Sequence, residues 1–318
     1  MLMDLNYYIN QLKFYASYFK QKRMINDIYT NSKIYEVVIA EQLQHTIING
    51  HANSSDARDS LGNIYEYKHY KKTSSNHTWT FNDFSESTIQ NISNINYVIF
   101  AEIDDTEIIP HISKMYKVPS KIVCTYLYKK TPQIKNKRLM INISPHQIES
   151  EMQFYPATIP SFSFSNELKK IFETANAIEQ LTNISSILTS NKLWELLVGM
   201  KLGHSINPEQ YKHDAVDQYG KTYEYKVYTR MSWSFQDISD RVLNGYLNDE
   251  AIILAIVDKQ NFIVKKLYIC NPDTIVKILY IKLQNKQRAK KKMSRLKETI
   301  TQKDLTWMLS NNYAYELL

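Results

Sequence analysis

Residues 56–70 of the chain read D-A-R-D-S-L-G-N-I-Y-E-Y-K-H-Y, and residues 214–228 read D-A-V-D-Q-Y-G-K-T-Y-E-Y-K-V-Y. Nine of the fifteen aligned positions are identical, at an offset of 158 residues. In both copies a glycine precedes alternating tyrosines, which is typical of a hairpin whose turn contains the glycine. Strand side chains alternate between faces, so each copy is expected to present its glutamate and lysine on one side.

The repetition extends on both sides of this stretch. Upstream, T-N-S-K-I-Y-E at 30–36 matches T-S-N-K-L-W-E at 189–195. Downstream, Y-V-I-F-A-E-I-D at 97–104 matches A-I-I-L-A-I-V-D at 251–258. Collinear matches over so long a span indicate an internal duplication.

The two copies meet near Pro156 and Pro160, which form a natural linker. We therefore expect two tandem domains of ordinary size, with the boundaries 1–159 and 160–318.

Each copy is expected to open with helices, because residues 5–29 and 166–189 carry apolar residues at three- and four-residue spacings. The continuous apolar runs that follow the hairpins predict buried central strands. This layout predicts an α/β fold, with a mixed central sheet flanked by helices in each of two units related by pseudo-two-fold symmetry. Residues 105–155 and 259–318 carry no comparably clear pattern.

Composition narrows the class of protein. The chain has 318 residues, of which 43% are hydrophobic, enough for two domains with cores of their own. Lys and Arg number 39 against 32 Asp and Glu, a net charge of +7 that suits a polyanionic partner and equally suits a basic protein without one. The lysine-rich run at 286–297 favours phosphate contact over a merely solvated face.

The cysteines and the hydropathy pattern bear on the compartment. Only Cys124 and Cys270 occur, in unrelated contexts, so neither a disulfide framework nor a cysteine zinc site is indicated. No segment is apolar for long enough to span a bilayer, and no export signal opens the chain. We expect a cytoplasmic protein with no membrane partner.

Each copy contains an aspartate, a glutamate seven residues later and a lysine two residues after that: Asp59, Glu66 and Lys68, and Asp217, Glu224 and Lys226. The hairpin is expected to bring each aspartate beside its glutamate, where the two carboxylates would bind Mg²⁺, an ion that prefers a few carboxylates and keeps waters and substrate oxygens. Such a centre suits phosphodiester hydrolysis. The lysine can orient or deprotonate the attacking water, or stabilise the pentacovalent state. Asp56 and Asp214 are also repeated, and either pair of aspartates fits the first acidic position.

This pattern resembles the PD-(D/E)XK nuclease superfamily, which includes many type II restriction endonucleases. The resemblance covers the core of each half and departs from the pattern where Arg58 and Val216 replace the proline. In that superfamily a preceding helix often adds a glutamate, a position that Glu36 and Glu195 match. These two residues fit equally well as first-turn carboxylates that favour the helix dipole.

The resemblance implies a Mg²⁺-dependent endonuclease that acts on double-stranded DNA. The chain would be a monomer that serves as a pseudo-dimer, with one active site for each strand, and its products would carry a 5′-phosphate and a 3′-hydroxyl. A repair, toxin or RNA-directed nuclease of the same fold is the nearest alternative. A non-catalytic nucleic-acid-binding module is the alternative from another class; it predicts at least one eroded site, whereas both residue sets are complete.

Overall fold

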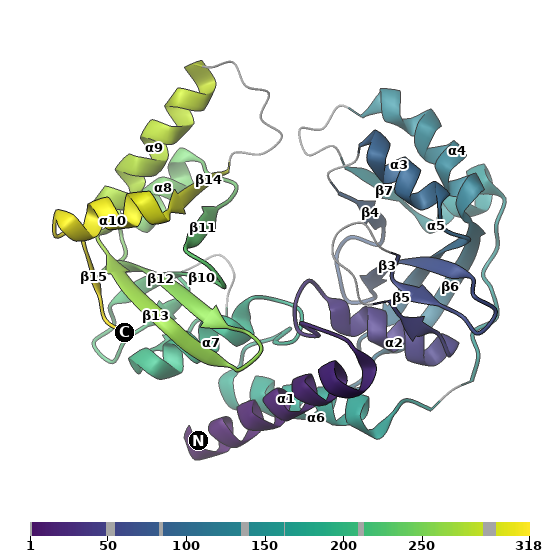
Figure 1. The fold of residues 1–318 in the computed structure, drawn as a ribbon, viewed down its shortest axis with the longest axis horizontal. Helices are drawn as coiled ribbons and strands as arrows, with labels where there is room; N and C mark the ends of the chain where they lie inside the picture. The colour runs from purple at the N-terminus through teal and green to yellow at the C-terminus, as the bar shows by residue number, and fades with distance from the viewer. Residues whose placement is uncertain are drawn as a thin grey trace. The chain divides into compact units, whose positions relative to one another are not determined.

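The computed structural model describes residues 2–48, 55–82, 85–134, 140–161, 163–208, 213–288 and 297–318. The chain divides into two compact units, Leu2–Ala177 (the N-terminal unit) and Ile178–Leu318 (the C-terminal unit). The predicted α/β class is confirmed, because both units combine helices with mixed sheets (Figure 1). The domain boundary expected at 159/160 stays a prediction. No helix in the described ranges is both long and apolar enough to cross a membrane.

The N-terminal unit is built on a five-stranded sheet of order β1-β2-β3-β5-β6, in which β3 and β5 run parallel and the other neighbours antiparallel. A separate pair is formed by β4 and β7. The elements are α1 (Leu2–Arg23), α2 (Lys33–Leu43), β1 (Thr46–Ile47), β2 (Ala57–Arg58), β3 (Ile64–Lys71), β4 (Trp79–Phe81), α3 (Glu86–Ser93), β5 (Tyr97–Asp104), β6 (His111–Pro119), α4 (Ser120–Lys130), the 3-10 turn η1 (Thr131–Gln133), β7 (Ile141–Ile143), α5 (Pro145–Gln147) and the π-helical turn η2 (Ile148–Met152).

The C-terminal unit has a six-stranded sheet of order β15-β13-β12-β10-β9-β8, with β10 and β12 parallel, and a separate pair of β11 and β14. Strands β8, β9, β10, β12 and β13 follow one another across this sheet as β1, β2, β3, β5 and β6 do in the other unit. After α6 (Asn166–Thr182), which contains the division between the units, come α7 (Lys192–Leu202), β8 (Ser205–Ile206), β9 (Ala215–Val216), β10 (Thr222–Tyr228), β11 (Ser232–Phe235), α8 (Asp240–Tyr246), β12 (Ala251–Asp258), β13 (Ile263–Cys270), α9 (Pro272–Arg288), β14 (Glu298–Thr301), α10 (Gln302–Ser310) and β15 (Ala314–Glu316).

The two predicted hairpins are confirmed and have the same turn. Strand β2 pairs antiparallel with β3, and β9 pairs antiparallel with β10. Gly62 and Gly220 have φ angles of 85° and 81°, in the left-handed region that residues with a Cβ rarely adopt. The glycine thus lets each chain reverse direction just before the strand that contains the glutamate and lysine.

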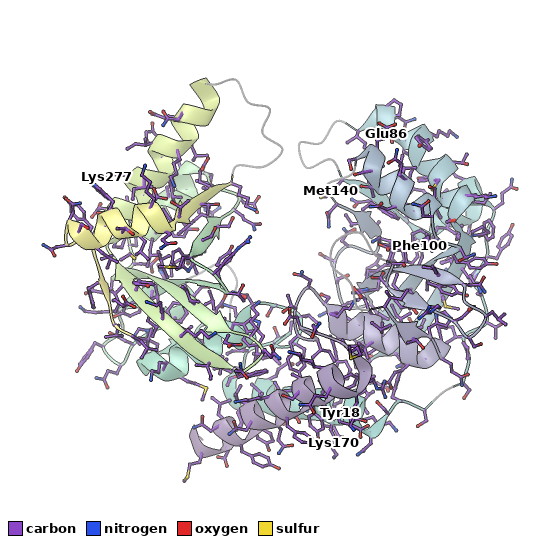
Figure 2. The ribbon with its side chains drawn as sticks, in the orientation of Figure 1. Tyr18, Glu86, Phe100, Met140, Lys170 and Lys277 are labelled. Carbon is purple, nitrogen blue, oxygen red and sulfur yellow. The ribbon has the colours of Figure 1, made fainter. Side chains whose placement is uncertain are left out.

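The side chains of β3 alternate between two faces of the sheet. One face carries buried tyrosines, and the other carries Glu66 and Lys68. Tyr65 and Tyr67 are buried, and α2 covers this side of the sheet. Tyr70, on the opposite side, joins the apolar cluster formed with Trp79 and with Phe100 of β5, which α3 and α4 cover (Figures 1 and 2). Trp79 donates its indole N–H to the carbonyl of Ala101, 2.9 Å away, as expected for a core anchor. Glu66 and Lys68 therefore lie at the rim of a packed core.

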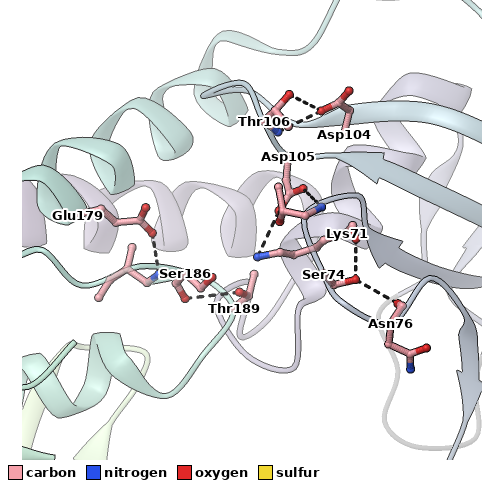
Figure 3. Close-up of polar contacts among 11 residues, drawn as sticks. Lys71, Ser74, Asn76, Asp104, Asp105, Thr106, Glu179, Ser186 and Thr189 are labelled. Carbon is pink, nitrogen blue, oxygen red and sulfur yellow. Dashed lines mark hydrogen bonds and ion pairs between the residues drawn. The ribbon is translucent and has the colours of Figure 1, made fainter. Parts of the chain in front are cut away.

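Polar contacts join the carboxyl ends of the parallel strands β3 and β5 (Figure 3). The Lys71 ammonium lies 3.3 Å from the carboxylate of Asp105, which also accepts hydrogen bonds from the amide and hydroxyl of Thr73. The neighbouring carboxylate of Asp104 accepts from the amide and hydroxyl of Thr106. These contacts fix the end of the strand from which Glu66 and Lys68 project.

The helical segments are shorter than predicted. The helix expected over 5–29 ends at Arg23, and the helix expected over 166–189 ends at Thr182. Met24 and Asn183, the residues that follow, have φ angles of 57° and 62°, and a left-handed residue cannot continue a right-handed helix. Apolar spacing continues beyond these points because the following loops also bury side chains, Ile25 and Ile184 among them.

Candidate active site

Asp56 is attached to the hairpin through both its backbone and its side chain. Its amide donates to the carbonyl of Tyr65 at 2.8 Å, and its Oδ2 accepts the amide of Tyr67 at 2.6 Å. In the C-terminal unit, Oδ2 of Asp214 accepts the amide of Tyr225 at 2.9 Å. Each carboxylate thus adds one hydrogen bond to the pairing of the two hairpin strands. The bonded amide belongs to the middle residue of an E-Y-K triplet, which spans residues 66–68 in one unit and 224–226 in the other.

The expected position of Asp59 beside Glu66 is wrong. The Asp59 carboxylate accepts the amides of Leu61 and Asn63 at 3.0 and 2.8 Å and the hydroxyl of Tyr65 at 2.8 Å. Tyr65 and Glu66 are consecutive strand residues and point to opposite faces, so Asp59 lies on the face away from Glu66.

Asp217 occupies the matching place in the C-terminal unit, where it accepts the amides of Tyr219 and Lys221 and the hydroxyl of Tyr223. A hydrogen bond from the side-chain amide of Asn63, supported by the other hydrogen bonds to the carboxylate, holds the pKa of Asp59 down at about 2. For Asp217, desolvation would raise the pKa, but the amides of Lys221 and Tyr219 outweigh it and the pKa is lowered. The two aspartates therefore cap their turns.

The charged cluster of the N-terminal unit comprises Asp56, Glu66, Lys68 and Glu36. The Lys68 ammonium lies 2.5 Å from Oε1 of Glu66 and 5.1 Å from the centre of the Phe81 ring. Burial raises the pKa of Asp56, and the negative charges of Glu66 and Glu36 raise it further. For Lys68, burial alone would lower the pKa, but the nearby carboxylates outweigh it and the pKa is raised. The structure thus brings together three of the predicted residues and replaces Asp59 by Asp56.

Glu36 reaches this cluster from the first turn of α2. It forms an ion pair with Lys33 of the same turn. Burial raises its pKa in spite of this lysine, and the charges of Glu66 and Lys68 both act on it. Glu36 is therefore a first-turn carboxylate of α2 and, at the same time, a member of the charged cluster.

The C-terminal cluster has the same members, namely Asp214, Glu224, Lys226 and Glu195. Lys226 forms an ion pair with Glu224 and lies 5.2 Å from the centre of the Phe235 ring. Burial raises the pKa of Glu224 to about 7, even though Lys226 opposes this shift. Burial would lower the pKa of Lys226, but Glu224 and other negative groups raise it overall. At neutral pH Lys226 is therefore an ammonium.

A second repeated lysine belongs to each cluster and was not singled out from the sequence. Lys192 lies 2.8 Å from Glu195 and 3.5 Å from Asp214, whereas its counterpart Lys33 pairs with Glu36. Both lysines lie in the matched segments 30–36 and 189–195, so the repeat could have identified them as candidate site residues.

Both clusters border open cavities. In the C-terminal unit a cavity of about 450 Å³ is lined by Glu195, Asp214, Glu224 and Lys226, and also by Gln236, Tyr246 and Lys259. In the N-terminal unit a cavity of about 480 Å³ is lined by Glu66 and Lys68, and also by the hydroxyl and amide side chains of Ser55, Asn82, Ser85, Ser87, Thr88, Asn91 and Asn94. Each cavity offers space for an extended polar ligand in front of the glutamate and lysine.

The carboxylates suit a hard cation with few protein ligands. In the described part of the chain, no three His, Cys, Asp or Glu side chains form a group that could hold a metal ion by themselves. The hydrogen bonds and ion pairs above use Oδ2 of Asp56 and Oε1 of Glu66, which leaves Oδ1 and Oε2 to be considered as ligands. Two carboxylates supplemented by waters and phosphate oxygens are an ordinary donor set for Mg²⁺. The residues therefore fit this ion and do not form a closed protein cage.

Comparison with family models and curated proteins identified no relative of the chain. No protein-family model matches the chain, and no curated protein matches it at a significant level. The functional inference consequently depends on the geometry of the two clusters and on the residue types that they share.

Proposed function

We propose that the protein is a Mg²⁺-dependent endonuclease that hydrolyses double-stranded DNA, with the tandem PD-(D/E)XK-like architecture that its sequence resembles. One observation supports this proposal above the others. Two independent hairpins each hold an aspartate near a glutamate and a lysine, through the same backbone hydrogen bond to the aspartate, and in each unit the glutamate and the lysine line a cavity. A duplicated structural ion pair would not require the aspartate that each hairpin also holds near the glutamate.

The proposed ligand pairs are Asp56 with Glu66 and Asp214 with Glu224. Asp59 and Asp217 are not proposed as ligands, because their carboxylates are engaged at the turns. Bound Mg²⁺ would neutralise the charge that develops on the phosphate oxygens. Glu36 and Glu195 stand behind each ligand pair as further acidic groups, each in an ion pair with a lysine.

The lysines are proposed to act as charged groups. Because the pKa of Lys68 and of Lys226 is raised, each side chain enters the reaction as an ammonium. An ammonium can donate a hydrogen bond to the attacking water and stabilise the negative charge on the pentacovalent phosphorus. The water oxygen then forms a bond to phosphorus while the bond to the 3′-oxygen breaks. The water gives up one proton to solvent and the 3′-oxygen takes one from solvent, which leaves a 5′-phosphate and a 3′-hydroxyl.

Two sites in one chain would allow one monomer to cut both strands. Restriction enzymes that act as dimers provide one active site for each strand, and a duplicated chain supplies two without a partner. This arrangement predicts that the loss of one site leaves a nicking enzyme.

Supercoiled plasmid tests the proposal. With Mg²⁺ the wild-type protein should linearise plasmids that contain its target, and with chelator it should leave them intact. Glu66→Gln and Glu224→Gln should each produce nicked circles and slow the second cut by about a hundredfold or more. The double variant should neither nick nor linearise the plasmid.

The alternatives appear as distinct outcomes. Cleavage of RNA but not of DNA would support an RNA-directed nuclease. Metal-independent binding of duplex DNA without any cleavage would support a binding module. Full-rate linearisation by Glu66→Gln would contradict the assignment of one site to each strand.

A further inference from the structure

The two clusters differ in the contacts of their second lysine. In the C-terminal unit Lys192 is buried, with 8% of the residue exposed, and its ammonium lies within 3.5 Å of both Glu195 and Asp214. In the N-terminal unit Lys33 is more open, and within the ranges that the structure describes it pairs with Glu36 alone. The same lysine of the repeat therefore reaches the ligand aspartate in one site and not in the other.

The contact with Asp214 involves the oxygen that a metal ion would need. Oδ2 of Asp214 accepts the amide of Tyr225, and Lys192 lies against the other oxygen, Oδ1. In the N-terminal site Oδ2 of Asp56 accepts the amide of Tyr67, and among the described residues no lysine pairs with its Oδ1. A divalent cation that approaches Asp214 thus meets an ammonium already in place.

We propose that Lys192 is a positioning residue that occupies the cation position of the C-terminal site, so that this site requires more Mg²⁺ than the N-terminal site. The inference depends on the proposed function, because it concerns the same ligand aspartate. An ion and an ammonium repel each other strongly at contact distance in a poorly solvated cluster, so Lys192 must withdraw from Asp214 before the ion binds. At limiting Mg²⁺ the N-terminal site would act first and the protein would nick DNA.

Two double variants isolate the sites in the full chain. Asp56→Asn with Glu66→Gln leaves the C-terminal site, and Asp214→Asn with Glu224→Gln leaves the N-terminal site. Calorimetric titration with Mn²⁺ should show affinity at least about tenfold weaker for the protein that retains the C-terminal site. Nicking of plasmid should reach half its maximum at a correspondingly higher Mg²⁺ concentration.

Substitution of the lysine tests its role directly. Added to the protein that retains the C-terminal site, Lys192→Met should strengthen Mn²⁺ binding to the level of the other site, while Lys192→Arg should keep binding weak because the charge remains. Lys33→Met in the matching background is the control and should change the affinity by less than about threefold, because Lys33 does not contact Asp56. Lys192→Gln, which keeps side-chain length and removes the charge, replaces Lys192→Met if the latter unfolds.

The outcomes separate this inference from the proposed function. Equal Mn²⁺ affinities at the two sites, or weaker binding in Lys192→Met and Lys192→Gln, would overturn the role of Lys192. Absence of Mn²⁺ binding at both sites would overturn it as well. If Mn²⁺ binding follows the expected pattern but no nucleic acid is cleaved, the nuclease proposal is wrong and the role of Lys192 stands.

Discussion

At the scale of single residues, the two aspartates of each hairpin have different tasks although only three positions separate them. Asp56 is half-buried near Glu66, and its carboxylate is linked to the strand by one amide. Asp59 is also half-buried, but it accepts hydrogen bonds from two turn amides and a tyrosine hydroxyl. The first aspartate is the proposed ligand of a cation, and the second caps the turn of the hairpin.

Exchange of the two carboxylates for amides should separate these tasks. Asp56→Asn should convert linearisation of plasmid into nicking, by the argument given for Glu66→Gln. Asp59→Asn should retain linearisation. Nicked product from Asp59→Asn in a folded protein would reinstate that residue as a ligand.

Asp59 should also contribute a pH-dependent part of the stability. Its hydrogen bonds, first of all with Asn63, lower its pKa from 3.8 to about 2 in the folded chain. The stabilisation is therefore complete above about pH 4 and is lost as the pH falls through 2. Denaturant titrations between pH 2 and pH 5 should give a flatter pH dependence for Asp59→Asn than for the wild type. Parallel curves would contradict this assignment.

At the scale of elements, the hairpin is the unit that builds the site. A glycine with a positive φ ends the turn region, a short strand pairs for two residues, and the aspartate side chain continues the pairing where the strand stops. The longer strand then delivers a glutamate and a lysine to one face. The same sequence of contacts occurs in both units.

Two glycines of the C-terminal unit should respond in opposite ways to alanine. Gly220 has φ +81°, so Gly220→Ala should destabilise the unit by about 1 kcal/mol through backbone strain alone, because a Cβ there meets no atom within 4 Å. Gly245 lies in α8, and a Cβ there also meets nothing, so Gly245→Ala should stabilise by about 0.5–1 kcal/mol. Thermal unfolding followed by circular dichroism measures both. Equal shifts would show that the turn conformation is not required.

The sequence predicted the elements that carry strong local patterns. The strand over 97–104, the turn at Gly62 and the shared face of Glu66 and Lys68 are present as expected. Periodicity could not identify which aspartate faces Glu66, because this depends on which turn amides capture Asp59. Nor could it place β6 or α4 within 105–155, since these elements bury residues on several sides.

At the scale of the whole molecule, charge and duplication combine. The chain carries a formal charge of +7 and two clusters with the same residue types. The basic run at 286–297, expected to contact phosphates, lies largely outside the described residues. A positive net charge suits the polyanionic substrate that the proposed function requires.

Salt should weaken duplex binding steeply. Lys and Arg that neutralise phosphates release counterions, so the Kd of the inactive Glu66→Gln, Glu224→Gln protein for a duplex should rise by about tenfold or more between 50 and 200 mM salt. Fluorescence anisotropy with a labelled duplex measures this change, and an uncharged-backbone analogue of the same sequence serves as the control. A Kd that does not change with salt concentration would contradict the binding of backbone phosphates by Lys and Arg.

Among the hydrogen bonds of the described residues, the Tyr67 amide is the only backbone donor to the carboxylate of Asp56, and the Tyr225 amide is the only one to the carboxylate of Asp214. The middle position of each E-Y-K triplet therefore tolerates any amino acid that retains this donor, as far as the ligand is concerned. Proline alone lacks it. In a library of variants randomised at Tyr67, the variants that still cleave DNA should carry many different side chains at this position. Proline should be absent from them.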